Sequence, residues 1–303
     1  MLRHAVFIAR IFNAAALMFV GALVAGWPTG DDVAHAESGN KTQAIQYPWS
    51  GTDDEIVVNL AIGSLRESML KWLTTERGVH AETLLVSIGA IAGFAVQCAV
   101  DERIKKRDVP GAHEGMPRDE LSKLMHEKGL AVVVTAKSGE NYQFGDLLNG
   151  YLVNQATTVN YHLFGILAGA AIQMGVKYAE LPDAIPMFAH ASKTIGTPEY
   201  GILHPPKPLN PHFTPHEALK QFWPEVKFIF ERTDGQRVVD PAKGRNVKPE
   251  YWPLVSALVA QQLLQWTKDV IDPRAGVGLI MESAIVMSKV DPKTVPQTEP
   301  PKN

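Results

Sequence analysis

The sequence predicts an α+β fold that is mainly α, with a helical core and two short β-hairpins. Apolar residues recur at helical spacing along most of the chain, while two stretches are rich in β-branched and aromatic residues near turn signals. Of the 303 residues, 46% are hydrophobic and 20% charged, which is typical of a chain with a substantial core. We therefore expect a single mainly helical domain over residues 47–290.

The N-terminus has the pattern of a leader. Two arginines precede an apolar segment at residues 11–27, and Ala34 and Ala36 are small residues suited to cleavage. We interpret residues 1–36 as a signal peptide, which predicts a periplasmic or secreted protein, or as an N-terminal anchor in contact with a membrane. A third interpretation is that translation starts near Val33, downstream of Met1, which predicts a cytoplasmic protein without the apolar segment.

The predicted domain lies between a polar tether at residues 37–46 and a disordered tail at residues 291–303. Thr52 and Glu55 have the spacing of a capping box and predict a helix start. Gly78 is expected to supply the left-handed stop of that helix. Apolar residues at helical spacing follow the capping box: Val58, Ile62, Leu65, Met69 and Trp72.

Two later helices carry matching stripes of small residues. Residues 88–100 read IGAIAGFAVQCAV and residues 164–176 read FGILAGAAIQMGV, so each has two glycines four apart and a glutamine four further on. Glycines on one helical face let another backbone approach closely, and we expect these two helices to pack against each other. An antiparallel pair brings Gln97 near His162 and Gln173 near Glu82. The match also leaves open a duplication, or a homodimer formed through the same stripes.

The two hairpins are predicted from short β-prone runs. The first joins residues 131–136 to Tyr142 and Phe144, and the second joins residues 228–230 to residues 238–239 through Asp234-Gly235. Further helices are predicted at residues 80–100, 119–128, 184–193, from the capping box at Thr214 and Glu217, at 253–271 and at 275–289. Five prolines exclude regular structure from residues 197–213.

Charge and cysteine content exclude several functional classes. A net charge of −3 predicts no nucleic-acid partner, although Arg103, Lys105, Lys106 and Arg107 form a short basic run that we read as a solvated loop. The single cysteine, Cys98, cannot form an internal disulfide and is expected to be an inert core thiol.

Catalytic and metal-binding motifs are incomplete. His80 and Glu82 match only the H-x-E fragment of zinc deaminases, and Pro215 separates His212 from His216. Nucleophile elbows and phosphate-binding glycine loops are missing from the sequence. We therefore expect no cofactor and no metal.

Polar residues set into apolar helices are the candidates for ligand binding: Glu82, Gln97, His162, Gln173 and Glu282. Glu282 lies among apolar neighbours, so it is expected either to be buried beside a partner such as His162 or to face solvent.

These candidates support three functional hypotheses. The first is an exported protein that binds a small apolar ligand or a protein partner in a helix-lined pocket. The second is an enzyme in which Glu282 and His162 act as an acid/base pair. The third is a membrane-anchored structural or assembly protein.

Overall fold

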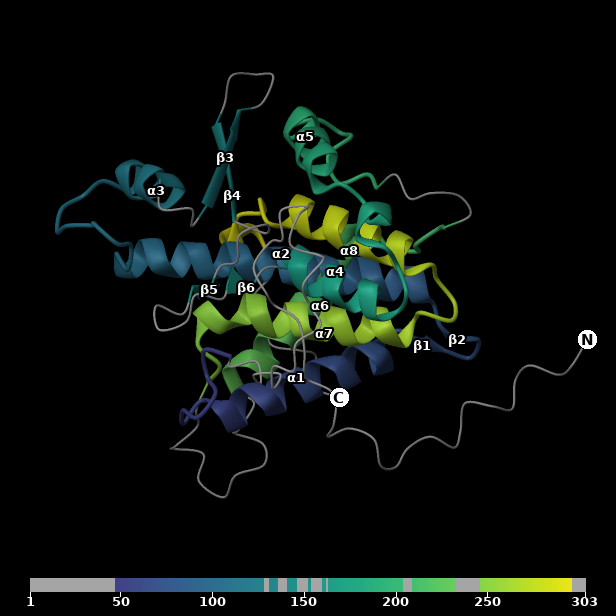
Figure 1. The fold of residues 1–303 in the computed structure, drawn as a ribbon. Coiled ribbons are helices and arrows are strands. Elements are labelled where there is room, and N and C mark those ends of the chain that lie inside the picture. Colours follow the sequence, from purple (N-terminus) through teal and green to yellow (C-terminus); the bar gives the residue numbers. More distant parts are fainter. Residues whose placement is uncertain are drawn as a thin grey trace, which may run out of the picture. The chain divides into compact units, whose positions relative to one another are not determined.

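The computed structural model is a mainly helical α+β fold, as the sequence predicts (Figure 1). It describes residues 47–127, 131–135, 141–145, 152–153, 160–161, 163–203, 209–232 and 246–295. The chain divides into a unit of residues 1–47 and a unit of residues 48–303, and the fold described below belongs to the second. The predicted leader, the polar tether and His162 lie outside the described residues.

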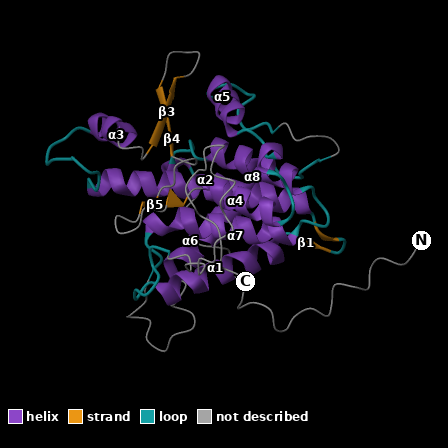
Figure 2. Cartoon of the chain, viewed as in Figure 1, coloured by secondary structure: helices purple, strands orange, loops and turns teal. Residues whose placement is uncertain are grey.

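Helices account for most of the described residues (Figure 2). Their bounds are α1 Glu55–Trp72, α2 Ala81–Lys106, α3 Arg118–Glu127, α4 Leu163–Gln173, α5 Ala184–Thr194, α6 Pro215–Arg232, α7 Trp252–Trp266 and α8 Pro273–Met287. Three 3₁₀ turns join them: η2 Tyr178–Glu180, η4 Pro249–Tyr251 and η5 Pro292–Thr294. Val295 is buried beyond η5, so the chain is ordered five residues into the predicted tail.

The helix α2 is the central element of the bundle (Figure 1). It packs against α6, α7 and α8, while α1 covers α6 and α7, α4 lies on α7 and α8, and α5 lies on α8. Its length and mean hydropathy of 2.0 would suffice to cross a membrane. In the fold, 89% of its most apolar window is buried against the other helices.

The glycines of α2 set how closely α8 approaches it. A Cβ added to Gly89 would lie 2.5 Å from the carbonyl oxygen of Ile280, and one added to Gly93 would overlap the backbone of Ala284. Both pairs advance by four residues, so α2 and α8 run parallel in a fixed register. Only glycine permits this backbone contact.

The prediction that the two glycine-striped helices pack against each other is wrong. The stripe on α2 is filled by α8, while α4 packs on α7 and α8 instead. Nothing among the described residues lies within 4 Å of a Cβ added to Gly169 on α4. The two similar stripes therefore have different packing partners, because a stripe of small residues does not determine which helix packs against it.

The first predicted hairpin is confirmed and the second is wrong. Strands β3 (Ala131–Thr135) and β4 (Asn141–Gly145) pair antiparallel, with Val133 opposite Gln143. Residues 228–230 instead belong to α6, where burial of Phe222, Val226 and Phe230 follows the helical period. The turn and second strand predicted for that hairpin lie outside the described residues.

Two further hairpins are shorter: β1 (Thr74–Thr75) pairs with β2 (Gly78–Val79), and β5 (Leu152–Val153) pairs with β6 (Asn160–Tyr161). Gly78, which was expected to end a helix, has a φ of +98° in the first of these hairpins. The helix α1 has already ended at Trp72.

The predicted capping box forms at the start of α6 but not at the start of α1. At α6, the carboxylate of Glu217 accepts from the backbone N–H of Thr214 at 2.9 Å, and the Thr214 hydroxyl accepts from the Glu217 N–H at 3.3 Å, as predicted. At α1, Thr52 instead forms a turn that precedes the helix, since its hydroxyl donates to the carbonyl of Trp49 at 2.7 Å. The N-cap is therefore Asp54 and the helix begins at Glu55, two residues later than predicted.

The basic run belongs to the last turn of α2 and its cap rather than to a loop. Lys105 lies 2.7 Å from Asp101 and Lys106 lies 3.2 Å from Glu102, both four residues apart on the helix. These pairs explain why α2 continues six residues beyond its predicted end.

Substitution of Gly93 by alanine is expected to lower the free energy of unfolding by about 1–3 kcal/mol, because the new methyl group forces α8 away from α2. The matched change Gly169→Ala adds a methyl group in open space and should raise stability by about 0.5–1 kcal/mol. Urea unfolding of both variants checks this. Equal effects at the two positions would contradict the assigned α2–α8 contact.

Candidate functional site

The structure distributes the predicted site residues over separate places. Glu82 lies in the first turn of α2, Gln173 ends α4, Gln97 lies in the second half of α2, and Glu282 is in the middle of α8. His162 is outside the described residues, so the proposed Glu282–His162 pair stays a prediction. Each of the four placed residues is examined below with its own neighbours.

Glu82 belongs to a polar junction at the start of α2. Its carboxylate lies 3.3 Å from Nε2 of His80, and Nδ1 of His80 lies 2.8 Å from the hydroxyl oxygen of Thr83. That same oxygen accepts from the backbone N–H of His212 at 2.9 Å. The rings of His80 and His212 stack with their centroids 3.8 Å apart. The junction therefore ties the segment before α6 to the first turn of α2.

The hydrogen bonds define how this junction works. In the neutral tautomer with its proton on Nε2, His80 donates toward Glu82 and its Nδ1 accepts from the hydroxyl of Thr83. Thr83 is only 2% exposed, so its hydroxyl is closed to a substrate and serves as a structural link. Within the described ranges, no group of three or more His, Cys, Asp or Glu residues could hold a metal ion.

Gln97 is next to a buried aromatic cluster. The ring of Phe94, one turn earlier on α2, lies 4.5 Å from Trp223 on α6, which lies 5.9 Å from Trp252 on α7. The Oε1 of Gln97 and the indole nitrogen of Trp223 are buried with no hydrogen-bond partner among the described residues. The neighbouring thiol of Cys98 has its pKa raised, chiefly by burial, which keeps it protonated and unreactive. This region is part of the core.

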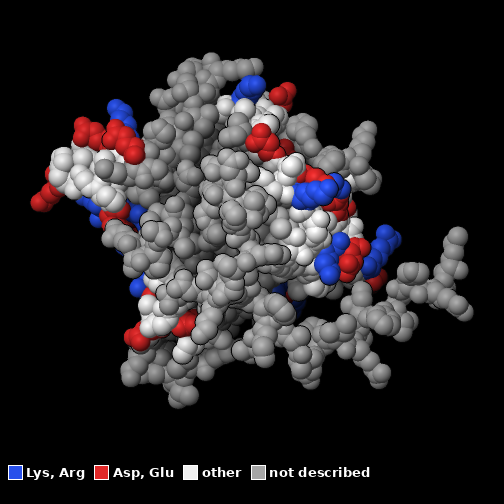
Figure 3. All heavy atoms as spheres, viewed as in Figure 1, with Lys and Arg blue, Asp and Glu red and all other residues white. Residues whose placement is uncertain are grey.

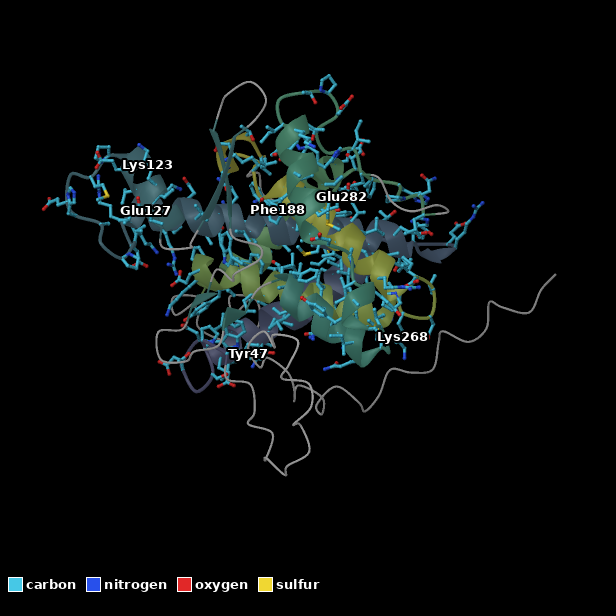
Figure 4. All side chains as sticks on the ribbon, turned by 45° about the horizontal axis from the view of Figure 1, so that its top comes forward. Tyr47, Lys123, Glu127, Phe188, Lys268 and Glu282 are labelled. Carbon is cyan, nitrogen blue, oxygen red and sulfur yellow. The ribbon has the colours of Figure 1, made fainter. Side chains whose placement is uncertain are left out.

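Glu282 is half-buried on α8, on the side where α5 packs (Figure 4). One turn later, the carbonyl of Val286 accepts from the hydroxyl of Tyr200 at 2.5 Å. Lys289 follows at the end of the same face, and burial lowers its pKa to about 8. Glu282 and Lys289 are thus two ionisable side chains on the same side of α8.

Gln173 leads to an exposed apolar surface. Its Oε1 accepts from Nε2 of Gln265 at 3.4 Å, which joins the end of α4 to the end of α7. Four large apolar side chains are exposed at this end of the bundle, and we call them the bundle-end surface: Ile172 (42% exposed), Tyr178 (54%), Trp266 (52%) and Val270 (79%). They are four of the six large apolar side chains that are exposed in the described part of the chain.

Charged side chains border the bundle-end surface. In Figure 3, an uncharged area lies among blue and red side chains where α4, α7 and α8 meet. Arg274 is paired with Asp272 and lies 3.7 Å from Glu180, which fixes η2 against the start of α8. The Arg274 guanidinium also lowers the pKa of Asp272, so this carboxyl stays ionised. Exposed charged residues at η2, after α7 and at the start of α8 include Lys177, Glu180, Lys268, Asp269, Asp272 and Arg274.

This arrangement has the composition of an interaction surface. Exposed Trp and Tyr beside aliphatic residues provide apolar area with little conformational entropy to lose, and a polar rim sets orientation. Of the four residues, the sequence offered no signal for Trp266 and Val270, because α7 is apolar on most of its circumference and gives no clear exposed face. Of the predicted candidates, Gln173 is the one in direct contact with α7 at this end.

Comparison of the chain with protein-family models, curated proteins and solved structures finds no match.

Replacement of Thr83 by valine is expected to lower the free energy of unfolding by about 0.5–1.5 kcal/mol, because it removes the buried hydroxyl that accepts from the backbone N–H of His212. The amide of His212 should also exchange its hydrogen faster. As a control, Thr74→Val removes a hydroxyl that bonds the Leu70 carbonyl at the exposed surface, and it should change stability by less than about 0.5 kcal/mol. An unaltered exchange rate at His212 would rule out the link.

Lys289→Met is expected to stabilise the protein by about 1–2 kcal/mol at pH 7, a figure reduced for the partial exposure of the side chain. The pKa of Lys289 is about 8 in the folded protein and 10.5 in the unfolded chain. Between these two pH values the unfolded chain binds more protons than the folded protein, so the stability of the wild type rises with pH. The advantage of the variant should therefore shrink by pH 10.5. Chemical denaturation at pH 7 and pH 10.5 measures it, and a pH-independent difference would contradict it.

Proposed function

We propose that this protein is a non-enzymatic interaction protein that binds an apolar segment of a protein partner on the bundle-end surface. The single observation that carries the proposal is that Ile172, Tyr178, Trp266 and Val270 are exposed in segments at the ends of α4 and α7 and in η2, where Gln173 bonds Gln265. Isolated exposed apolar residues are ordinary, but a group that includes tryptophan and tyrosine is typical of interfaces.

The size of the apolar contribution supports this choice. A buried aliphatic or aromatic side chain contributes about 1.5–3 kcal/mol relative to an exposed one, and roughly half or more of this area is still in water for Tyr178, Trp266 and Val270. Covering these side chains contributes favourable free energy to a complex, and contacts around them must supply the rest of what association costs.

The rigidity of the surface also supports it. Trp266 is the last residue of α7, and the residue before it, Gln265, is hydrogen-bonded to Gln173 of α4. Val270 lies in a turn that is closed by a hydrogen bond of 2.9 Å from its backbone N–H to the carbonyl of Thr267. A partner would meet a surface that is already ordered, so binding costs little conformational entropy.

The cellular setting of this function is part of the proposal. We keep residues 1–36 as a signal peptide that exports the chain to the periplasm or the medium, with an uncleaved anchor as the alternative. In either setting, the bundle-end surface belongs to residues 48–303 and its proposed role does not depend on cleavage.

Site-specific photo-crosslinking in the cells that make the protein tests the proposal. A photo-reactive residue at Val270 or Trp266 is expected to form a covalent adduct with another polypeptide, because both positions are on the bundle-end surface. The size of the adduct and its peptides identify the partner.

The matched control is Ile56 on α1, which is 73% exposed and lies outside the bundle-end surface. The same photo-reactive residue there should give no adduct. Adducts of equal yield at all three positions, or at none, would contradict the proposed function.

A further inference from the structure

We propose that an internal water site lies at the aromatic cluster that joins α2, α6 and α7, and that Gln97, Trp223 and Ser256 bind the water. The site is separate from the bundle-end surface and goes beyond the proposed function. Three buried side-chain atoms have no hydrogen-bond partner among the described residues: Oε1 of Gln97, the indole nitrogen of Trp223 and the hydroxyl oxygen of Ser256. Each of the three is on a different helix.

The aromatic cluster brings the three helices together. The ring of Trp223 lies 4.5 Å from that of Phe94 on α2 and 5.9 Å from that of Trp252 on α7. Gln97 comes three residues after Phe94 on α2, and residues three or four apart are neighbours on a helix surface. Ser256 comes four residues after Trp252 on α7. Both polar side chains therefore adjoin the rings that contact Trp223.

The register of α2 and α7 places the two polar side chains at similar heights along the bundle. Leu85 and Leu264 both adjoin Gly276, since a Cβ added there would lie 3.2 and 2.5 Å from their Cδ1 atoms. The helices run antiparallel, because the first residue of α7 lies at the cluster and its last turns lie beside the start of α2. From the two leucines, Ser256 is eight residues away and Gln97 is twelve. The difference of four residues is about 6 Å along the axis, or roughly one helical turn.

The hydroxyl of Ser256 behaves differently from those of two comparable serines. Ser87 and Ser283 are also fully buried within helices. Their hydroxyls donate at 2.7 Å to the carbonyl one turn earlier in the same helix. Ser256 makes no such bond, so its hydroxyl is left to bond a group outside its own helix.

Water is the ligand that suits these three atoms. The indole nitrogen of Trp223 can only donate and Oε1 of Gln97 can only accept, while the hydroxyl of Ser256 can do both. One water can accept from the indole, donate to the amide oxygen and bond the serine, which gives the about three hydrogen bonds typical of buried waters. The rings of the cluster are already in contact, so a larger ligand would have to separate them. The water thus links three helices inside an apolar core, and it is the ligand of Gln97.

Nuclear magnetic resonance of the isotope-labelled full chain tests the site through the indole N–H of Trp223. This proton is expected to show a cross peak to a long-lived water. The matched control is Trp252, whose buried indole donates to the carbonyl of Val247 at 2.9 Å and should show no such cross peak. The comparison needs no variant. A Trp223 indole without a water cross peak, or equal cross peaks at both indoles, would overturn the inference.

A variant tests the second partner of the water. Gln97→Met keeps a similar volume and removes the acceptor, so the water cross peak of Trp223 is expected to be lost. Gln173→Met makes the same change in an exposed amide that bonds Gln265, and it should leave the cross peak intact. The other indole resonances report whether each variant is folded. Persistence of the cross peak in folded Gln97→Met, or its loss in both variants, would overturn the inference.

Discussion

The backbone contact between α2 and α8 is the constraint on which the rest of the fold depends. Gly89 and Gly93 let the two helices approach until the carbonyl groups of Ile280 and Ala284 occupy the space of a missing Cβ. This close approach fixes their parallel register, and α6 and α7 then pack against α2. Because α4 rests on α7 and α8, the bundle-end surface is also positioned by this contact.

Several polar groups in the described part of the chain join segments that are distant in sequence. Thr83 holds the backbone of His212 to α2, Tyr200 bonds the carbonyl of Val286, and Arg274 connects Asp272 with Glu180. Each of these links bridges two elements, which is why polar residues within apolar sequence are poor guides to a catalytic site here.

Local patterns predicted the helices well because a helix is specified by residues close in sequence. The Thr214–Glu217 box and the start of α6 follow from hydrogen bonds over three residues. The run at residues 228–230 was misread because its β-prone side chains suggest a strand, whereas burial of Phe222, Val226 and Phe230 favours a helix in the folded chain. The sequence carries both signals, and packing decides between them.

The contacts that form the candidate site could not be predicted, since they join distant segments. Thr83 and His212 are 129 residues apart, and no local pattern announces that their side chain and backbone will meet. Exposure of Trp266 is equally hidden, because it depends on how other helices pack around the end of α7 rather than on its own neighbours in sequence.

The parallel pairing of α2 with α8 also determines the order in which the chain can fold. A ribosome adds about 5–20 residues per second, so α2 waits on the order of ten seconds before the helix that fills its glycine stripe has been made. During that time α2, which is long and apolar, lacks the helix that packs against its glycines. Its apolar residues are then open to non-native contacts until α8 has been made.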